Sequence, residues 1–337
     1  MAVTSRDIAR IVGVSVSTVS RSLNDNPRIS ADTREKIKRV AAELDYEFDA
    51  SARSLATRRS GTVVLVCPDF LDRFANGLYL NLLIHDLRRN LASRGLDCLV
   101  TEGASPSGKG TLRRLVLQRK VDGILLLLAG TMPEDWTLIR KRAIPVVQVH
   151  NVPSYFDVGR LDYFFTDNVR GGRLAAEALI EAGSRRMAYM AAPRPNPEMA
   201  DRERGLKEAL EERGLFPDEL LRLEVENSYD AAYTCVRRNI EALKRVDGLF
   251  AYTDVMAFGA IRALTDEGVE VPRDLRVVGY DDIEIANWVR PGLTTIHQPR
   301  EEVARLATDR LFDLLEGRGE GVEQRMIAPF LVRRESC

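Results

Sequence analysis

The sequence predicts an N-terminal all-α helix-turn-helix module followed by an α/β body of two doubly wound parallel-sheet lobes. Residues 1–46 show helical periodicity only, whereas short β-rich runs alternate with amphipathic helices from residue 62 onward. Such alternation is typical of parallel sheets joined by crossover helices. Because roughly 270 residues are many for one open sheet, we expect two similar lobes.

The β-rich runs of the body are short and mostly apolar, and the segments between them have the spacing of amphipathic helices. The expected strands are Thr62–Cys67, Asp97–Thr101, Gly123–Leu128, Pro145–His150, Met187–Ala191, Gly248–Tyr252 and Val277–Tyr280. Helices are expected at Leu78–Arg94, Val169–Ala182 and Arg202–Arg213. Ligands bind such sheets at the carboxyl ends of the strands, so a cleft between the lobes is the expected ligand site.

Charge is distributed unevenly along the 337 residues. Residues 1–60 hold 11 Lys and Arg against 8 Asp and Glu, whereas the remainder is slightly acidic. A small basic module joined to an acidic body is typical of a nucleic-acid binder with a separate sensing domain. We therefore predict three segments, which are a helix-turn-helix DNA-binding domain at 1–46, a linker at 47–61 and an effector-binding and dimerisation domain at 62–337.

Other classes of protein are disfavoured by what the sequence lacks. It has no apolar run of about 20 residues and no N-terminal signal region, so we expect a cytoplasmic protein without a membrane partner. The cysteines and histidines lie in no metal-ligand spacing, so no metal is expected. A segment resembling a phosphate-binding loop has Gly110 where Ser or Thr must hold magnesium. No cofactor is therefore expected.

Local signals define three helices in residues 1–46. Thr4 begins a capping box, and Gly13 ends the first helix and permits a tight turn. Ser15 can cap a second helix, Val16 to Asn24, and a third begins at Ser30. Two short helices joined by a Gly-containing turn and supported by a third form a helix-turn-helix.

The outward face of the second helix carries small polar residues and one arginine, without an acidic group. This surface can enter a DNA major groove without repelling phosphate. Arg21 can bond a guanine edge in a bidentate way, and Val16 can contact a thymine methyl group. A three-helix protein-interaction module is the alternative that spacing alone leaves open.

Residues 3–55 resemble the Lac repressor/galactose repressor (LacI/GalR) family of bacterial transcriptional regulators. The matching residues are Asp7-Ile8-Ala9, Gly13 through Asn24, Ser30, Thr33 through Ile37, and Leu44-Asp45-Tyr46. The resemblance implies that Val16, Ser17 and Arg21 contact bases, although Arg21 could instead contact phosphate. It also implies phosphate contacts by Thr4, Ser5, Thr18 and Asn24.

The linker resembles the hinge helix of this family, which orders on operator DNA. Residues 49–58 are good helix formers, but the segment is too short to be a stable helix alone in water. Ala52 and Leu55 match the hinge residues that contact DNA, and Leu55 matches a leucine that wedges between base pairs. Packing of Leu55 on the body is the alternative. Phe48-Asp49 departs from the family's Pro-Asn: Asp49 can still cap the hinge helix, but the resemblance places its negative charge near phosphate.

The body resembles the family's effector domain, which has the fold of periplasmic sugar-binding proteins. Its markers include Asp167-Asn168, Arg202-Glu203-Arg204-Gly205-Leu206, Val278-Gly279-Tyr280-Asp281-Asp282-Ile283 and Leu293 through Pro299. The resemblance implies that Arg202 and Asp281 contact the effector, together with Phe74, His150, Asn196, Thr253 and Trp288. The alternatives are a surface ion pair for Arg202, an interlobe structural acid for Asp281 and a core position for Trp288.

These expectations combine into a ligand-responsive, sequence-specific DNA-binding regulator. The resemblance implies a homodimeric repressor of carbohydrate-metabolism genes, bound to a pseudo-palindromic double-stranded operator and controlled by a sugar or sugar derivative. A co-repressor-dependent regulator that binds a purine or a phosphoprotein partner is the main alternative. An enzyme is not expected, including a sugar-processing one, because no nucleophile, base and orienting group occur together.

Overall fold

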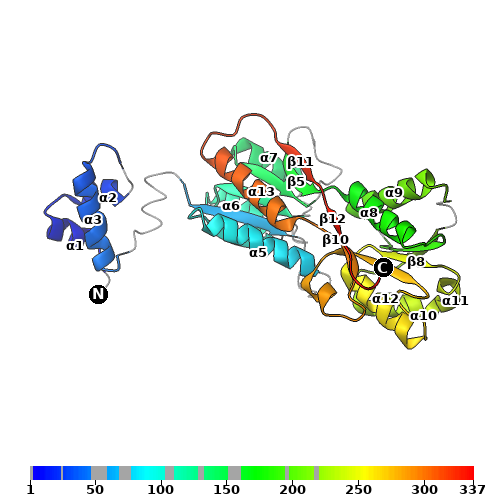
Figure 1. The fold of residues 1–337 in the computed structure, drawn as a ribbon. Helices are drawn as coiled ribbons and strands as arrows, with labels where there is room; N and C mark the ends of the chain where they lie inside the picture. Colours follow the sequence, from blue (N-terminus) through cyan, green and yellow to red (C-terminus); the bar gives the residue numbers. More distant parts are fainter. Residues whose placement is uncertain are drawn as a thin grey trace. The chain divides into compact units, whose positions relative to one another are not determined.

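The computed structural model describes residues 3–23, 26–46, 59–67, 77–102, 110–127, 133–150, 161–193, 197–215 and 220–337. The chain divides into two compact units (Figure 1). The first comprises Met1–Thr62 with Arg119–Asp122, and the second comprises Val63–Gln118 with Gly123–Cys337. Each unit has its own apolar core, and they are described separately below.

Within the described residues, the first unit contains three helices, α1 (Ser5–Val12), α2 (Val16–Leu23) and α3 (Ala31–Glu43). Ile8, Val19 and Ile37, one from each helix, are fully buried and form the centre of the core. Hydrophobic spacing along each helix places these side chains on one face, so the three helices bury them together. The predicted three-helix arrangement is confirmed, although Asn24, the expected last residue of the second helix, lies outside the described residues.

The helix ends form as their capping residues predict. The Thr4 amide donates to the Asp7 carboxylate at 3.0 Å, which completes the predicted capping box. Gly13 follows α1 with φ +78°, a conformation that favours glycine. The hydroxyl oxygens of Ser15 and Ser30 accept the Thr18 and Thr33 amides at 3.0 and 3.3 Å. Gly13 and the Ser15 cap fix the tight turn between α1 and α2, and the Ser30 cap begins α3.

Ser22 is a polar residue in the core of this unit. Its side chain is fully buried, and its hydroxyl has no hydrogen-bond partner within the part of the chain that the structure describes. We expect Ser22→Ala to stabilise α1–α3 by about 1 kcal/mol, because a buried unpaired hydroxyl is removed. Native-state hydrogen exchange of the α1–α3 amides in the full chain measures this local stability. Ser17→Ala on the exposed face is the matched control, and faster exchange in Ser22→Ala than in the wild type would contradict the prediction.

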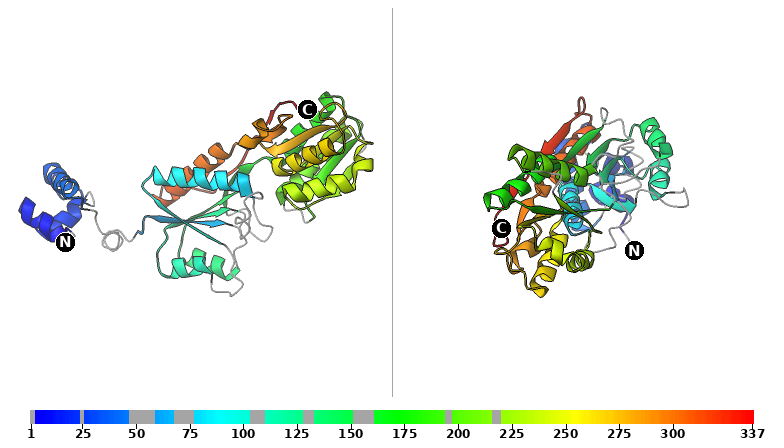
Figure 2. Two further views of the ribbon diagram at one scale, coloured as in Figure 1. Left: turned by 90° about the horizontal axis from the view of Figure 1, so that it is seen from below. Right: turned by 90° about the vertical axis from the view of Figure 1, so that its right-hand side faces the viewer.

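The first lobe of the second unit is built on a sheet with strand order β11-β5-β4-β3-β1-β2. Its strands are β1 (Thr62–Cys67), β2 (Asp97–Glu102), β3 (Gly123–Leu127), β4 (Val146–Val149), β5 (Asp162–Thr166) and β11 (Gln324–Ile327). The pairings from β1 through β3, β4 and β5 to β11 are all parallel. Helices α5 (Leu78–Ala92) and α13 (Arg300–Leu315) cover one face, and α6 (Thr111–Leu117) and α7 (Pro133–Lys141) cover the other (Figure 2).

The second lobe is built on a sheet with strand order β12-β10-β9-β8-β6-β7. Its strands are β6 (Met187–Ala191), β7 (Leu221–Glu224), β8 (Gly248–Ala251), β9 (Arg276–Asp281), β10 (Thr294–His297) and β12 (Phe330–Val332). The helices are α8 (Asn168–Glu181), α9 (Pro197–Glu212), α10 (Tyr229–Arg238), α11 (Ile240–Leu243), α12 (Asp254–Asp266) and η5 (Glu284–Asn287). The predicted fold class is confirmed, with one antiparallel pairing, between β10 and β12.

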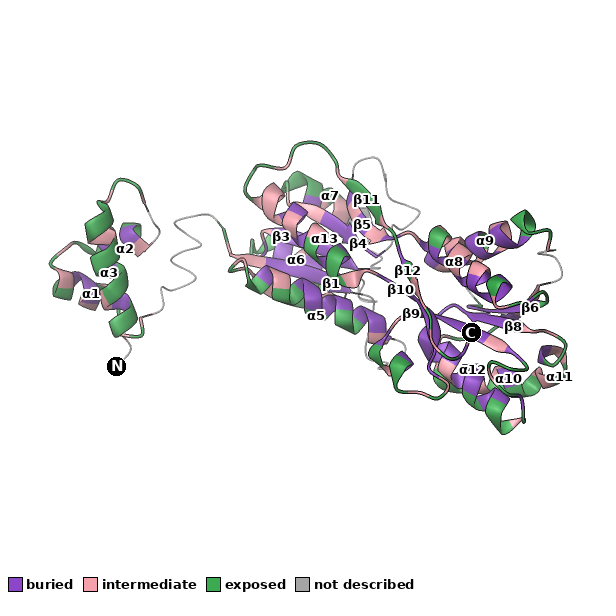
Figure 3. Cartoon of the chain, viewed as in Figure 1, coloured by how far each residue is buried: buried purple, intermediate pink, exposed green. Residues whose placement is uncertain are grey.

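Burial follows the layered arrangement of both lobes. Strands β3, β6 and β8 are buried along their whole length, as Figure 3 shows. Helices on both faces of a parallel sheet exclude water from its central strands, which accounts for their continuous apolar sequences. Each lobe therefore has a rigid core that can hold polar side chains in place at the ends of its strands.

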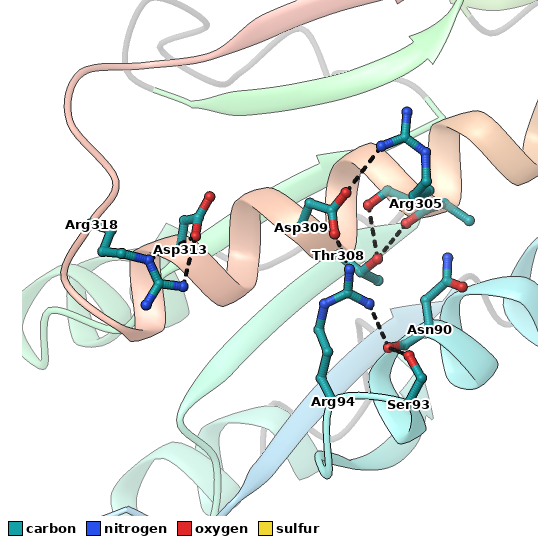
Figure 4. A network of polar contacts seen from close by, with 9 residues as sticks. Asn90, Ser93, Arg94, Arg305, Thr308, Asp309, Asp313 and Arg318 are labelled. Atoms are coloured by element: carbon teal, nitrogen blue, oxygen red, sulfur yellow. Dashed lines mark hydrogen bonds and ion pairs between the residues drawn. The ribbon is translucent and has the colours of Figure 1, made fainter.

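Helices α5 and α13 are joined by charged side chains at both ends of their contact. Arg94 follows α5, donates to the Asn90 carbonyl at 2.8 Å and pairs with Asp309 of α13 (Figure 4). Toward the other end, Arg300 pairs with the buried Asp86 at 2.9 Å. These pairs fix the orientation of α13, which begins directly after the chain leaves the second lobe.

The chain passes between the two lobes three times. The passages follow Thr166 of β5, His297 of β10 and Ile327 of β11. Two of them are in contact, because the Asp167 amide donates to the Ile327 carbonyl at 2.9 Å. Residues in these passages are therefore placed where any change in lobe orientation must be accommodated.

Three further features concern the cysteines, the lengths of the helices and possible metal ligands. All four cysteines are free thiols. Within the described ranges, every helix is too short or too polar to cross a membrane. Among the same residues, no cluster of three or more His, Cys, Asp or Glu side chains could hold a metal ion.

Candidate DNA-binding surface and effector site

The predicted base-contacting residues lie on the exposed side of α2. Val16 is 42% exposed, and Ser17 and Arg21 are also exposed. Val19, on the opposite side of the same helix, is fully buried. The helix therefore presents a small, non-acidic face with one guanidinium group, and its other face is fixed to α1 and α3. This geometry matches that of a helix that enters a major groove.

The predicted phosphate-contacting residues surround that face. Thr4 is exposed, and Ser5 and Thr18 are partly buried. The Thr18 hydroxyl is 2.9 Å from the Ser15 hydroxyl, so its position is set by the cap of α2. The other predicted DNA contacts, Asn24, Ala52 and Leu55, lie outside the described residues, as does most of the predicted linker.

The predicted effector residues Arg202, His150 and Asp281 come from different elements and lie within electrostatic range of one another. Arg202 is on α9, His150 follows β4, and Asp281 ends β9. They therefore meet at the carboxyl ends of strands from both sheets, where α/β proteins bind ligands. We refer to this group, with the side chains that touch it, as the Arg202 cluster.

Glycines bring the helix that carries Arg202 close to its neighbour. A Cβ atom on Gly172 of α8 would lie 2.0 Å from the Arg202 carbonyl oxygen, and one on Gly205 would lie 1.9 Å from the Val169 carbonyl oxygen. Both contacts are to backbone, which cannot move aside as a side chain can. The two helices therefore pack with their backbones in contact, and Arg202 is held at a fixed depth above the sheet.

The Arg202 side chain is buried and is held by two hydrogen bonds and one aromatic ring. It is 3% exposed, which excludes the surface ion pair considered from the sequence. Its Nε donates to Asn168 Oδ1 at 2.9 Å, and its Nη1 donates to the Tyr252 carbonyl at 2.6 Å. The guanidinium carbon lies 3.6 Å from the centre of the Tyr280 ring, a cation–π contact. Among described residues, none accepts a hydrogen bond from Nη2, so this nitrogen can bond a ligand.

His150 contributes a neutral group that joins the two lobes. Its Nδ1 lies 3.0 Å from Glu198 Oε1 of α9, and its ring is 5.5 Å from the Tyr79 ring of α5. Burial lowers the pKa of His150 to about 3, with a further contribution from the charge of Arg202. At neutral pH His150 is therefore an uncharged imidazole, which can donate from one nitrogen and accept at the other.

Two acidic side chains complete the cluster. Asp254, at the start of α12, is fully buried and accepts the Ile283 amide at 3.0 Å and the Thr295 hydroxyl. Asp281 accepts from Gln298 Nε2 at 2.7 Å. Burial raises the pKa of Asp281 to about 7, opposed by the charge of Arg202. Burial, with the charge of Asp281, likewise raises the pKa of Asp254. The site can thus offer hydroxyl groups both acceptors and a charged donor.

The raised pKa of Asp281 makes the stability of the fold depend on pH. Arg202, Gln298, Asp254 and Tyr79 face this carboxyl. Because the folded protein binds the proton more tightly than an unfolded chain with a pKa of 3.8, the stabilisation is complete below that pH and lost as pH rises to about 7. We expect Asp281→Asn to gain stability relative to the wild type as pH rises across this interval.

Thermal unfolding of both proteins in one set of buffers measures this difference. Asp313→Asn is the matched control, because Asp313 is an exposed acid of α13 paired with Arg318. A melting-temperature difference between Asp281→Asn and the wild type that is constant from about pH 4 to pH 8 would contradict the prediction.

The other predicted effector residues are placed differently. The Thr253 hydroxyl caps α12 by accepting the Met256 amide and donates to Asn227 Oδ1 at 2.8 Å. Trp288 follows η5 and is 64% exposed, so it is not the core residue considered from the sequence. Phe74 and Asn196 lie outside the described residues.

Several residues of the cluster were not identified as site residues from the sequence. These are Tyr79, Asn168, Glu198, Tyr252, Asp254, Tyr280 and Gln298. Asn168, Asp254, Tyr280 and Gln298 fall within segments that marked the resemblance of the body, which was the one available signal. Their contacts depend on which strand ends meet, and the sequence pattern does not specify this.

Two family descriptions match the chain. Residues 4–48 match the bacterial regulatory proteins of the lacI family, and residues 176–337 match the periplasmic binding protein-like domain. The first match contains α1–α3, and the second contains the second lobe from within α8 onward, with most of the Arg202 cluster.

Characterised relatives match along nearly the whole chain. The HTH-type transcriptional regulator CelR of Thermobifida fusca is 34% identical over 313 residues, with 90% of each chain covered. The ribose operon repressor of Escherichia coli is 31% identical over 337 residues, with 99% of each covered. The transcriptional repressor PurR of Haemophilus influenzae is 29% identical over 338 residues, with 99% of this chain and 98% of that one covered.

Solved structures of related regulators also match along nearly the whole chain. The complex of the transcriptional regulator CelR with cellobiose has a TM-score of 0.72 at 29% identity and covers 99% of this chain and 100% of that one. The lac repressor dimer bound to operator and the anti-inducer ONPF has a TM-score of 0.81 at 25% identity and covers 100% of this chain and 99% of that one. Both similarities include the helical unit and both lobes.

Proposed function

Because this chain belongs to the LacI family of bacterial transcriptional regulators, we propose that it is a repressor whose affinity for an operator is controlled by a small sugar-like effector. As a member of that family it is a DNA-binding regulator and not an enzyme. The repressor is proposed to act as a homodimer in the cytoplasm, on a pseudo-palindromic double-stranded operator.

The observation that carries the effector half of this proposal is the Arg202 cluster. A buried guanidinium, a neutral imidazole and buried carboxyl groups converge at strand ends of both lobes. A sugar ring presents several hydroxyls, each of which both donates and accepts, and fixed groups of both kinds are what it requires. The buried oxygens Tyr252 Oη and Gln298 Oε1 also have no partner among the described residues, so they offer further bonding capacity.

The relatives support a sugar without deciding which one. One relative is a ribose operon repressor, and one similar structure contains cellobiose. A purine remains the competing effector, because a PurR repressor is similar at 29% identity. The acids of the cluster favour an uncharged ligand with hydroxyl donors, since the carboxyls of Asp281 and Glu198 lie near Arg202 and that of Asp254 lies near Asp281.

We propose that the effector acts through the orientation of the two lobes. Residues of the cluster come from both lobes, so a bound ligand contacts both and stabilises one relative orientation. A change in orientation would be transmitted to the residue 47–61 linker, which leaves the first lobe through β1. In the dimer the spacing of two such linkers would set whether their helices form on DNA, with Ala52 and Leu55 in the minor groove.

A thermal-shift panel tests the effector assignment with the full chain. D-ribose, cellobiose, their phosphates, and hypoxanthine as a purine are each titrated, and a ligand that binds the folded state raises the melting temperature. We expect at least one uncharged sugar to do so. Stabilisation by hypoxanthine alone would replace the sugar with a purine, and turnover of any sugar would contradict a regulator.

Arg21 is the residue of α2 on which sequence recognition should depend most. We expect Arg21→Ala to weaken operator binding by roughly 1–3 kcal/mol and to relax the preference at one base pair of each half-site, because a bidentate contact to guanine is lost. Fluorescence anisotropy with operator variants at a fixed salt concentration measures both effects.

Arg39→Ala is the matched control, since Arg39 is an exposed arginine of α3 paired with Glu43. It should leave the base preference unchanged. If Arg21→Ala weakens binding to every duplex equally, Arg21 contacts phosphate rather than a base.

A further inference from the structure

Asn168 lies where the chain passes from the first lobe to the second. It is the first residue of α8, two residues after the end of β5, and its side chain is 5% exposed. Its Nδ2 donates to the Thr166 carbonyl of β5 at 3.0 Å. Its Oδ1 accepts from Arg202 Nε at 2.9 Å and from the Tyr280 hydroxyl at 3.1 Å. One amide thus connects a strand end of the first lobe to two side chains of the second.

These bonds are not needed to begin α8. The side chain of Asp167 caps the helix by accepting the Arg170 amide at 3.0 Å. Asn168 therefore follows a helix cap that is already complete, and its amide is available for tertiary contacts. If Asn168 served only to begin α8, its Oδ1 would not need to accept from Arg202 of α9, and its Nδ2 would not need to donate to the Thr166 carbonyl of β5.

Among the residues that the structure describes, Asn168 is the side chain that accepts a hydrogen bond from Arg202 Nε. The other fixed contacts of Arg202 are the Tyr252 carbonyl, through Nη1, and the face of the Tyr280 ring. A guanidinium group that is bonded at one nitrogen and packed on one face can still rotate within its own plane. Hydrogen bonds at both Nε and Nη1 prevent this rotation and fix the directions of its N–H groups. The described contacts leave Nη2 as the nitrogen directed to a ligand, and its direction depends on the bond to Asn168.

Tyr280 is placed by the same amide. A Cβ atom on Gly171 would lie 2.2 Å from the Tyr280 hydroxyl oxygen, so the phenol lies directly against the backbone of α8. Its hydroxyl hydrogen is donated to Asn168 Oδ1, the atom that also accepts from Arg202. The ring beneath the guanidinium and the guanidinium itself are thus oriented by a single oxygen atom.

We propose that Asn168 is the positioning residue of the effector site, which fixes Arg202 and Tyr280 relative to the passage between the lobes. This inference rests on the proposed function, in which Arg202 contacts the effector. Because the same amide bonds to the end of β5, a change of lobe orientation at residues 166–168 changes the direction of Arg202. Occupancy of the site and lobe orientation are thereby linked through one side chain.

The first experiment requires no effector and uses the full chain. Melting temperatures are measured for Asn168→Ala, Arg202→Ala and the double variant. If Asn168 acts through Arg202, the double variant loses little more than the larger single loss, because each substitution removes the same contact. Fully additive losses overturn the proposal, since Asn168 would then stabilise the fold independently of Arg202.

The second experiment measures the response to cellobiose and D-ribose as probes, by the concentration that gives half of the maximal thermal shift. We expect Asn168→Ala to raise this concentration about tenfold or more. Asn168→Asp keeps an acceptor for Arg202 and Tyr280, so it should restore the response to within about threefold of the wild type. Asn239→Ala, which removes an amide bonded to the Cys235 carbonyl in the same lobe, is the matched control and should respond like the wild type.

The two experiments separate failure of the proposal from failure of the proposed function. If neither probe shifts the wild type, the choice of sugar is wrong, and the additivity measurement alone decides the role of Asn168. If the wild type responds and Asn168→Ala responds with the same half-maximal concentration, Asn168 does not position the ligand-binding group and the proposal is overturned.

Discussion

Arg202→Met should abolish the response to effector and leave operator binding in the absence of effector intact. Methionine retains most of the buried side-chain volume but removes the guanidinium that bonds Asn168 and Tyr252. The proposed charge-assisted contact from Nη2 to a ligand hydroxyl is lost as well, so effector affinity should fall by about 100-fold or more. The helices proposed to contact DNA belong to the other unit and contain none of these residues.

Isothermal titration with the effector found in the thermal-shift panel, and anisotropy with operator DNA, measure the two halves of this prediction. Arg204→Met is the matched control, because Arg204 is an exposed arginine two positions along the same helix, paired with Asp201. It should bind effector like the wild type. An Arg202→Met protein that responds to effector normally would remove Arg202 from the site.

Gly205→Ala should lower the free energy of unfolding of the second unit by about 3 kcal/mol or more. The added methyl group would lie 1.9 Å from the Val169 carbonyl oxygen and 3.0 Å from the Arg173 nitrogen, both backbone atoms of α8. The two helices must therefore separate. Because Arg202 lies one turn before Gly205 on α9, the separation would also move the guanidinium away from Asn168.

Urea unfolding of the full chain, followed by circular dichroism, measures the loss of stability. Gly110→Ala is the matched control, since Gly110 has φ −57° and a Cβ there would meet no atom within 4 Å. Its free energy of unfolding should change little. A Gly205→Ala protein as stable as the wild type would show that the close approach of α8 and α9 is not required.

Local sequence signals were sufficient for the parts of the fold that depend on neighbouring residues. The caps at Thr4, Ser15 and Ser30 and the turn at Gly13 identified the three-helix unit, because each acts within one helical turn. Continuous apolar runs identified the central strands in the same way. Such runs are typical of strands covered on both faces.

The strands that the sequence analysis did not identify were β5, β7, β10, β11 and β12. Strands β7, β11 and β12 lie at sheet edges, are three or four residues long and contain a single buried residue among them, so no continuous buried run marks them in the sequence. Strand β5 begins at Asp162, whose carboxylate pairs with Arg310 of α13 at 2.8 Å, a contact between residues far apart in sequence. In a sequence pattern, which compares a residue only with its neighbours along the chain, a polar strand residue whose partner is distant cannot be distinguished from a loop residue.

The effector site was predicted only in part, because its contacts also join residues that are far apart in the sequence. Arg202, His150 and Asp281 were named from resemblance, and the structure brings them together. The group that orients Arg202 is on another helix, at Asn168, and the partner of His150 is Glu198 of α9. Those pairings follow from how the chain passes between the lobes, and no local pattern encodes that geometry.

The central claim is that the exposed face of α2 recognises one DNA sequence and that occupancy of the Arg202 cluster controls this recognition. Selection from a randomised duplex pool by the full-length protein, with and without the effector, tests it most directly. We predict enrichment of one pseudo-palindromic sequence whose retention changes when effector is added, and loss of the effector dependence in Arg202→Met. Recovery of random sequence under every condition would contradict the account.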